Sequence, residues 1–526
     1  MRQRITITAT LLLVLAGCDP DRGVLTPAEP RLTKQASTTL PANGTDTLDD
    51  TQAFRDALAL ANVVNVPAGT YYISDQITLD SNNHLIGAGE AQTKIIQRKY
   101  GYNFFYAAHA TNVRVEGLRF EAPADSVVNF QVALRADNSS GVYFYNNRAI
   151  NVGLIRIHNV GTPAEPNSMA DRSSIVRIEG NAGVGPGRGA KTHGIAVAFS
   201  DDVRIMGNYV DYYNHGIAVW GGQADPSKTQ PTDPPYTSTR WTTNVTIANN
   251  VVRESETGIV TMNTEGAFIH YNRVESCTDV CLDAEGGKDI TFSQNTGIDA
   301  ANGVLATFFR ADNIVFDGNT VYQHGRYEAN HENVTKLWNT MFGQNNGGSA
   351  VGKADEHRIF VRNNKFYYRD TATPQAQGTF GVVAKHATAR FEFTGNNAEN
   401  TRLDLAPDRS GHALVSNNYL LFTRPTGSAG QNAIYAGNSW DDVALFDLTV
   451  TNNTIESTVA QSAPAIWVPQ WAPQPIASTV CGNTAISFPK LLHVNNQNAN
   501  HVYYLGASEQ ASTPSVSGGT VVPITC

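Results

Sequence analysis

The chain has 526 residues, of which 16% are charged and 41% apolar, and it carries 44 Gly and 23 Pro. This composition excludes a disordered polyelectrolyte and a coiled coil, and it indicates a turn-rich globular protein. The formal net charge of −9 counts against a nucleic-acid-binding protein, which has to neutralise phosphates. By length alone, three or four domains of roughly 150 residues would be expected.

Residues 1–17 are predicted to be a signal peptide. A short basic stretch precedes an apolar run from Ile5 to Ala16, which is too short for a comfortable transmembrane helix. The run leads into Leu-Ala-Gly-Cys18, which resembles the lipobox of bacterial lipoproteins, where cleavage leaves the cysteine as the acylated N-terminus. We therefore expect an extracytoplasmic protein, in the periplasm or at the cell surface, that lipid on Cys18 anchors to a bacterial membrane. Residues 18–43 are rich in Pro, Thr, Ser and Ala and are expected to form a flexible tether.

An amphipathic helix is predicted near residues 49–61. Phe54, Leu58 and Ala61 fall on one helical stripe, and acidic residues stand at its start, where the helix dipole favours negative charge. Such a helix would cap a repeat structure, because the terminal coil of a solenoid otherwise exposes its apolar core.

A repeated strand followed by asparagine decides the architecture. Short runs of β-branched and apolar residues recur, and Asn follows each of them at one offset. The shortest spacings are 22, 23 and 24 residues, the size of one coil of a right-handed parallel β-helix. We interpret these asparagines as a scaffold ladder, since Asn tolerates turn conformations and can hydrogen-bond its equivalents in adjacent coils. The ladder comprises Asn147, Asn181, Asn208, Asn250, Asn272, Asn295, Asn319, Asn364, Asn396, Asn418 and Asn453.

Three motifs near the N-terminus resemble the pectate-lyase-like superfamily: DDTQAFRDAL at 49–58, VNVPAGTY at 64–71 and the GAG turn at 87–89. The resemblance implies an all-β fold, a right-handed parallel β-helix over residues 44–455 with its capping helix. Residues 456–526 are expected to form C-terminal coils and a cap. Members of this superfamily commonly act on polysaccharides as hydrolases, lyases or epimerases, and others are phage depolymerases or inert adhesins. The resemblance therefore indicates the fold more firmly than the reaction.

Four cysteines follow Cys18. Export would place them where disulfides persist, so Cys481 and Cys526 are candidates to staple the C-terminal segment. Cys277 and Cys281 either pair or pack as two small core residues.

Four consecutive coils can be stacked by treating the residue eight positions after each ladder asparagine as equivalent. These residues open four strands and are Gly216, Gly258, Val280 and Gly303. Positions three and five residues further on are expected to face outward, so Asp283 and Glu285 share the outer face with Cα atoms about 6.6 Å apart. The positions expected to face inward are Ala218, Val260, Leu282 and Leu305, then Trp220, Met262, Ala284 and Thr307.

Asp283, Glu285 and Asp279 are the predicted catalytic residues. Cleavage of a glycosidic bond needs an acid to protonate the leaving oxygen and a base or nucleophile opposite it, and two carboxyl groups roughly 5 to 9.5 Å apart provide them. Crowding would raise the pKa of one carboxyl so that it stays protonated near neutral pH. The alternative is that these acids are solvated surface groups or bind Ca²⁺.

Seven further residues are predicted to bind substrate along the same face. Histidines and cations suit sugar hydroxyls and acidic groups, and an aromatic ring suits a sugar face. The predicted binding residues are His215, His193, Asn263, Glu265, Arg310, Lys288 and Trp220.

The leading hypothesis is an extracytoplasmic glycoside hydrolase that binds a polysaccharide in a β-helix groove and uses paired carboxylates without a cofactor. The first alternative is a polysaccharide lyase or uronate epimerase, in which Lys288 or Arg310 with His215 would carry the chemistry and the carboxylates would hold Ca²⁺. The second alternative is a glycan-binding or structural surface protein without catalysis. The net negative charge mildly disfavours an anionic substrate, although a local basic patch can override it.

Overall fold

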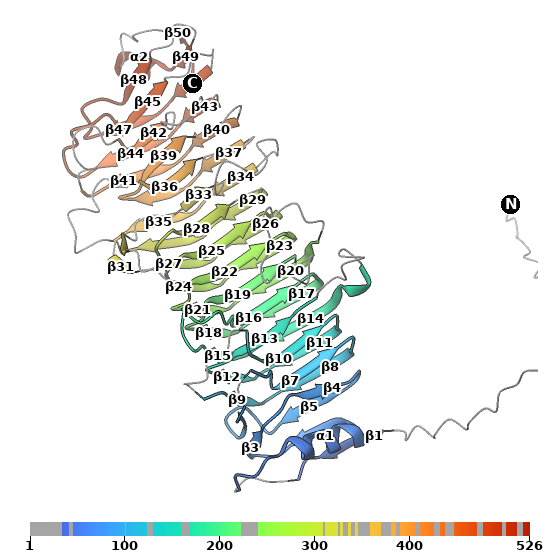
Figure 1. Ribbon diagram of the computed structural model, residues 1–526. Coiled ribbons are helices and arrows are strands. Elements are labelled where there is room, and N and C mark those ends of the chain that lie inside the picture. Colours follow the sequence, from blue (N-terminus) through green and yellow to red (C-terminus); the bar gives the residue numbers. More distant parts are fainter. Residues whose placement is uncertain are drawn as a thin grey trace, which may run out of the picture.

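The protein is known from a computed structural model, in which the chain winds into an elongated stack of coils. The N-terminal helix lies at one end of the stack and the C-terminal strands lie at the other (Figure 1). Among the described residues, no helix is long and apolar enough to cross a membrane. The structure describes residues 34–41, 46–99, 101–123, 130–159, 169–221, 240–308, 311–324, 327–329, 335–337, 342–345, 358–369, 380–385, 390–406, 411–424, 432–436, 446–470, 477–496, 501–512 and 519–526.

Each coil contributes one strand to each of three sheets, which we name A, B and C. The order A, B, C repeats along the chain, and strands of successive coils pair in parallel. The described part of sheet A has 18 strands, and those of sheets B and C have 15 each. This arrangement confirms the predicted parallel β-helix.

Sheet A contains β1 (Gln35–Thr39), β2 (Ala61–Val66), β5 (His84–Gly87), β8 (Thr111–Glu116), β11 (Ser140–Tyr145), β14 (Ser173–Glu179), β17 (Ser200–Met206), β20 (Thr242–Ala248), β23 (Thr264–His270), β26 (Lys288–Ser293), β29 (Asp312–Asp317), β34 (Arg358–Arg362), β37 (Arg390–Thr394), β40 (Gly411–Ser416), β43 (Phe446–Thr451), β46 (Ala477–Cys481), β49 (Val502–Leu505) and β50 (Thr520–Pro523).

Sheet B contains β3 (Gly69–Ile73), β6 (Thr93–Gln97), β9 (Arg119–Glu121), β12 (Arg148–Ile150), β15 (Ala182–Val184), β18 (Tyr209–Asp211), β21 (Val251–Arg253), β24 (Arg273–Cys277), β27 (Thr296–Ala300), β30 (Thr320–Gln323), β35 (Lys365–Tyr368), β38 (Asn397–Glu399), β41 (Tyr419–Phe422), β44 (Thr454–Ser457) and β47 (Thr484–Ile486).

Sheet C contains β4 (Ile77–Leu79), β7 (Phe105–Ala108), β10 (Val132–Asp137), β13 (Gly153–Ile157), β16 (Ile195–Ala198), β19 (His215–Trp220), β22 (Thr257–Met262), β25 (Val280–Glu285), β28 (Gly303–Phe308), β33 (Phe342–Asn345), β36 (Phe380–Lys385), β39 (Arg402–Ala406), β42 (Ile434–Ala436), β45 (Ile466–Gln470) and β48 (Leu492–Asn496). Outside the three sheets lie a 3-10 helix, η1 (Met169–Asp171), and an antiparallel pair, β31 (Tyr327–Ala329) and β32 (Thr335–Leu337).

The predicted capping helix is present as α1 (Thr51–Leu60), which covers the apolar end of the first coil. Its Phe54 side chain is fully buried and meets the rings of Tyr71 and Phe105 edge-on, with centroids 5.8 and 6.0 Å away. Ala61, predicted to lie on the helical stripe, instead begins β2 and is also fully buried. At the other end of the stack, α2 (Ala507–Ser512) and β50 follow the last coils.

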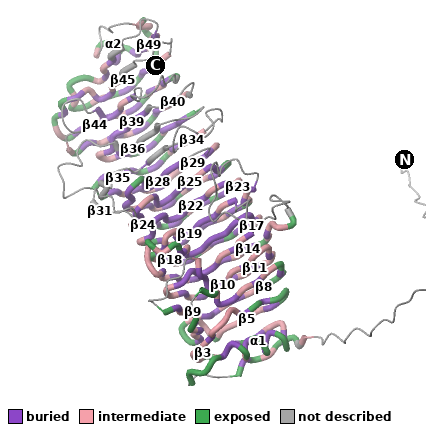
Figure 2. The backbone as a smooth tube through the Cα atoms, viewed as in Figure 1, coloured by how far each residue is buried: buried purple, intermediate pink, exposed green. Residues whose placement is uncertain are grey.

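Inward-facing side chains form one continuous core inside the three sheets. Figure 2 shows buried residues running along the length of the stack. The alternation within each strand sends every second side chain to this core, because successive residues of a strand point to opposite faces.

The asparagine ladder is confirmed as scaffold. The backbone N–H and the Nδ2 of Asn250 both donate to Oδ1 of Asn272 at 2.9 Å, and the same pattern recurs from coil to coil. The ladder runs one step beyond the predicted set, to Asn483. The backbone N–H and Nδ2 of Asn483 donate to Oε1 of Glu509 in α2, at 2.8 and 3.1 Å.

Candidate active site

Strand β25 directs Asp283 and Glu285 to the outer face of sheet C. Its sequence alternates, so Leu282 and Ala284 lie in the core between them. The predicted outward placement of both acids is therefore confirmed.

The predicted register is wrong by one residue between β22 and β25, whereas the predicted pairings of β19 with β22 and of β25 with β28 are confirmed. Arg253 pairs with Glu275, 22 residues further on, whereas Ile259 pairs with Leu282, 23 residues further on. One extra residue is therefore accommodated between Glu275 and Leu282. As a result, four residues predicted to face inward lie on the outer face of sheet C: Ala218, Trp220, Val260 and Met262.

With the corrected register, Asp283 belongs to a row of outward residues that crosses sheet C from coil to coil. We call this row the central column. Both neighbours of Asp283 in it, Val260 and Ala306, are apolar and buried. The central column comprises Thr78, Tyr106, Arg135, Arg156, Ala196, Ala218, Val260, Asp283, Ala306, Asp404, Tyr435, Trp467 and His493. The backbones of Gly343 and Val383 pair in register between Ala306 and Asp404.

Asp283 is a buried carboxyl that favours its protonated form. Its side chain is only 2% exposed. Burial raises the pKa of Asp283 well above its usual range, and the charges of Glu285 and Asp279 raise it further. Asp283 also shares a side-chain hydrogen bond with Glu285, which requires a proton on one of the two carboxyls. The three predicted catalytic acids are thus brought together, and the pKa of Asp283 is raised by the other two as well as by burial.

Asp279 lies in the turn before β25, beside an acid that the sequence reasoning missed. Its backbone N–H donates to the carbonyl oxygen of Glu256 at 2.9 Å, so the two acids lie in adjacent coils. Each carboxylate accepts from an amide: Asn302 Nδ2 donates to Asp279, and Asn214 Nδ2 donates to Glu256. Glu256 is only 8% exposed. The sequence did contain a signal for Glu256. It stands directly before Thr257-Gly-Ile, just as Asp279 stands directly before Val280-Cys-Leu in the next coil.

Glu285 lies in a second outward row, between Met262 and Phe308. Trp220 precedes Met262 in the same row and is partly exposed. Asn263, one of the predicted binding residues, follows the strand by one residue, and its backbone N–H donates to the carbonyl oxygen of Glu285 at 3.1 Å. The apolar neighbours of Glu285 add to the desolvation of the acid pair.

His193 and His215 form a stacked pair two to three coils away from β25. Their rings are 4.6 Å apart, and Phe130 meets His193 edge-on at 5.8 Å. Burial, together with His215 and Arg156, holds the pKa of His193 well below its usual range. The two histidines therefore lie side by side in adjacent coils, and their substrate-binding role stays a prediction.

Glu265 and Lys288 lie around the corner, on sheet A. Lys288 Nζ donates to Glu265 Oε1 at 3.2 Å, and both side chains are partly exposed. Their substrate-binding role stays a prediction. Arg310 lies outside the described residues.

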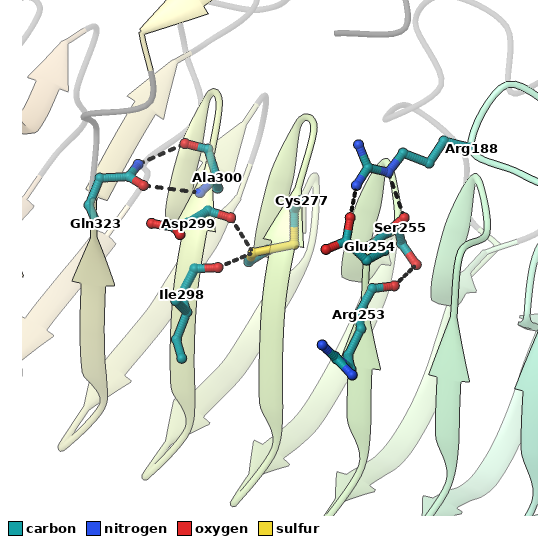
Figure 3. Close-up of a disulfide and its surroundings, with 10 residues drawn as sticks. Arg188, Arg253, Glu254, Ser255, Cys277, Ile298, Asp299, Ala300 and Gln323 are labelled. Atoms are coloured by element: carbon teal, nitrogen blue, oxygen red, sulfur yellow. Dashed lines mark hydrogen bonds and ion pairs between the residues drawn. A yellow bond between two sulfur atoms is a disulfide. The ribbon is translucent and has the colours of Figure 1, made fainter. Parts of the chain in front are cut away.

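Cys277 and Cys281 form a disulfide within the segment that accommodates the extra residue, on the coil of Asp279 and Asp283 (Figure 3). Cys281 Sγ lies 3.8 and 3.5 Å from the carbonyl oxygens of Ile298 and Asp299 in the next coil. The second pair, Cys481 and Cys526, is also bonded and joins β46 to the C-terminus.

Aromatic residues continue the central column toward the C-terminus. Tyr435, Trp467 and His493 are partly exposed, with ring centroids 5.4 and 6.1 Å apart in sequence order. Such rings can stack on sugar faces. Sequence reasoning missed them because the four-coil register stopped before these strands.

No three His, Cys, Asp or Glu side chains are arranged to hold a metal ion in the part of the chain that the structure describes. Apolar residues flank both acids of β25: Val260 and Ala306 lie on either side of Asp283, and Met262 and Phe308 lie on either side of Glu285.

The comparisons with known proteins match the β-helix part of the chain. A family model of a right-handed beta helix region matches residues 236–346. The pre-mature gene product 12 of bacteriophage phi29 is 15% identical, with a TM-score of 0.46, over 91% of this chain and 72% of that chain. The tailspike of E. coli bacteriophage HK620, in complex with a pentasaccharide, is 12% identical, with a TM-score of 0.43, over 90% and 74%. The A-module of an Azotobacter vinelandii mannuronan C-5 epimerase is 14% identical, with a TM-score of 0.34, over 92% and 98%.

No curated protein sequence matches this chain. The family match agrees with the coil geometry and with the fold that the pectate-lyase-like resemblance implied: the chain is a right-handed parallel β-helix protein.

Proposed function

We propose that this protein is a polysaccharide-cleaving enzyme, a glycoside hydrolase whose acid is Asp283. The observation that supports it most is a buried carboxyl, kept protonated by burial and by two neighbouring acids, on the outer face of the coils. A proton held near neutral pH is what protonation of a glycosidic leaving oxygen requires.

The roles follow from the contacts. Asp283 and Glu285 share one proton and act together as the acid, because two adjacent carboxylates resist ionising together. Asp279 is the base that activates water, since the amide of Asn302 holds it in place. This assignment differs from the predicted use of Asp283 and Glu285 as acid and base, because hydrogen-bonded carboxyls are closer than the roughly 5 Å or more that separates catalytic pairs.

The test is a panel of polysaccharides with product masses measured. Hydrolysis adds water to the products, and Asp283→Asn, Glu285→Gln and Asp279→Asn are each expected to lower the rate by about 10²- to 10⁴-fold. Glu121→Gln is the matched control, because Glu121 forms ion pairs with Lys94 and Arg119 on sheet B.

Other outcomes would assign another function. Unsaturated, ultraviolet-absorbing products would indicate the lyase alternative, and saturable binding without turnover would indicate a glycan-binding protein. Full activity in a folded Asp283→Asn variant would refute the proposed acid.

We also propose that the enzyme is anchored outside the cytoplasm through lipid on Cys18, which lies outside the described residues. Labelled palmitate is expected to enter the wild-type protein and not Cys18→Ser, which should leave the membrane fraction. Retention of Cys18→Ser in that fraction would contradict the anchor.

A further inference from the structure

Two arginines, Arg135 and Arg156, lie on the central column N-terminal to the acids, and Asp137 follows Arg135 by two residues on the same strand. Arg135 forms a bidentate salt bridge with Asp137, with hydrogen bonds of 2.8 and 2.7 Å, and the Tyr106 hydroxyl donates to the same carboxylate at 3.2 Å. The oxygens of Asp137 are therefore already occupied by Arg135 and Tyr106.

Arg156 pairs with Arg135 across the strands and has a different environment. Its contacts among the described residues are His158 Nδ1, 3.4 Å away, and the face of Phe130, 4.8 Å from the guanidinium carbon to the ring centroid. No carboxylate of the described residues lies within ion-pair distance of it, and the side chain is half-buried. Burial and the charge of Arg135 lower the pKa of Arg156 to about 10, so it remains a cation at neutral pH.

The neighbouring histidines are neutral. Burial, with the charges of Arg156 and Arg135, lowers the pKa of His158 to about 3. Its Nδ1 can therefore accept a hydrogen bond from Arg156, and its ring adds no charge. His193 is neutral for the same reason, and it contacts Phe130. Two guanidinium groups thus face one carboxylate, which leaves one positive charge with unused donors in a fork suited to an anion.

The face between Arg156 and Asp283 suits an extended chain. Four strand spacings of about 4.8 Å place the two residues about 19 Å apart. Only Ala196, Ala218 and Val260 lie between them on the column, and Trp220 lies in the adjoining row. A single sugar cannot span this length, whereas an oligosaccharide segment can.

We propose that Arg156 binds an acidic group of the polysaccharide, a uronate carboxylate or a sulfate ester, several sugars away from the bond cleaved at Asp283. The inference deepens the proposed function by assigning an anionic substrate, although the chain as a whole carries a net charge of −9. The basic patch is local, and it lies on the same face as the acids.

Binding can be measured without cleavage in the Asp283→Asn background. Affinity gel electrophoresis would use polygalacturonate, alginate and dextran sulfate as probes, with dextran as the neutral control. At least one acidic glycan is expected to retard the protein, and Arg156→Gln is expected to weaken that binding at least tenfold. Arg156→Lys should bind with intermediate strength, because it keeps the charge and loses the fork. Uronate and sulfate probes distinguish the two acidic groups.

Arg273→Gln is the charge-matched control. Arg273 pairs with Glu275 on sheet B, and Glu275 keeps Arg253 as its partner in the variant. Thermal unfolding of each variant checks that it is folded. If Arg156→Gln does not fold, Arg156→Lys is used to test the proposal in its place. Undiminished binding by Arg156→Gln, retardation by dextran alone, or binding of none of the acidic probes would overturn the proposal. Binding that depends on Arg156 in a protein without hydrolytic activity would refute the proposed reaction and leave this site standing.

Discussion

The pKa of Asp283 connects its chemistry with the stability of the fold. Apolar neighbours on both sides remove water from the carboxyl, and two further acids oppose its ionisation. The folded state therefore binds a proton that an unfolded chain releases above its ordinary pKa of about 4. The raised pKa therefore has two effects: it makes Asp283 available as an acid, and it lowers the stability of the folded state at a pH that favours ionisation.

The wild-type protein is predicted to lose stability as the pH rises above about 4. The pKa of Asp283 is raised in the folded state, so its contribution to stability is present below the unfolded pKa and is lost as the pH rises through the folded one. The loss amounts to about 1.4 kcal/mol for each pH unit between the two pKa values. Asp283→Asn, which does not titrate, should show a flatter dependence and an equal or higher melting temperature at pH 7.

Denaturant unfolding of both proteins between pH 4 and 8 measures this difference. Glu121→Gln controls for the loss of an acid elsewhere, since Glu121 lies in a half-buried ion-pair group on sheet B. Parallel pH curves for wild type and Asp283→Asn would show that Asp283 is ionised in the folded protein, and would remove the basis for its acid role.

For single residues, the sequence predicts only those features of a side chain that its own strand determines. The outward direction of Asp283 and Glu285 follows from the two-residue period within β25, whatever the neighbouring coils do. The placement of Trp220 depends on counting residues across coils, so one extra residue reversed it. The raised pKa of Asp283 depends on Val260 and Ala306, which come from coils before and after it.

At the scale of elements, the turn between β24 and β25 is the irregular part of the active coil. The extra residue lies within the segment from Glu275 to Leu282, and the disulfide Cys277–Cys281 closes the same segment. Asp279 lies inside that loop and Asp283 follows it by two residues. The disulfide therefore constrains the backbone that presents the acids.

Loss of this disulfide is predicted to lower the catalytic rate strongly while lowering the free energy of unfolding only modestly. In the chain-entropy picture a loop this short contributes about 2 kcal/mol, whereas the longer loop closed by Cys481–Cys526 contributes about 4 kcal/mol. The double variant Cys277→Ser/Cys281→Ser should lose at least tenfold in rate while remaining folded at 25 °C, because Asp279 is no longer held.

Cys481→Ser/Cys526→Ser is the matched control, because its bond joins β46 to the C-terminus on other coils. It should melt at a lower temperature and keep its rate at 25 °C. Melting curves and rates of the two variants, measured side by side, separate the effects. Equal rates in both double variants would mean that the short loop does not position the acids.

At the scale of the whole molecule, the sequence predicts the architecture because the repeat is written into every coil. One asparagine per coil from Asn147 to Asn483, at a spacing with a floor of 22 residues, indicates a solenoid, and a length that suggested several domains becomes a single stack. The sequence cannot reveal where the ladder stops. Asn483 follows β46, and its acceptor Glu509 comes from a helix that lacks the repeat.

Glu509 is predicted to stabilise the C-terminal end of the stack. Its Oε1 accepts from both the backbone N–H and the Nδ2 of Asn483, and its side chain is fully buried. Glu509→Ala leaves two buried donors without an acceptor, which is expected to cost about 2–3 kcal/mol. Glu509→Gln retains an oxygen at the Oε1 position and should lose about 1 kcal/mol or less.

Thermal unfolding followed by circular dichroism, with light scattering for association, compares the two variants. Because stability in a solenoid passes between neighbouring coils, Glu509→Ala should fray from the C-terminal end, and amide exchange should rise first in β46, β48 and β49. Exchange in α1 and β2, at the opposite end of the stack, should remain unchanged and serves as the internal control. If Glu509→Ala has the melting temperature and the amide exchange rates of the wild type, the ladder needs no terminal acceptor. The C-terminal coils would then be held by their apolar contacts alone.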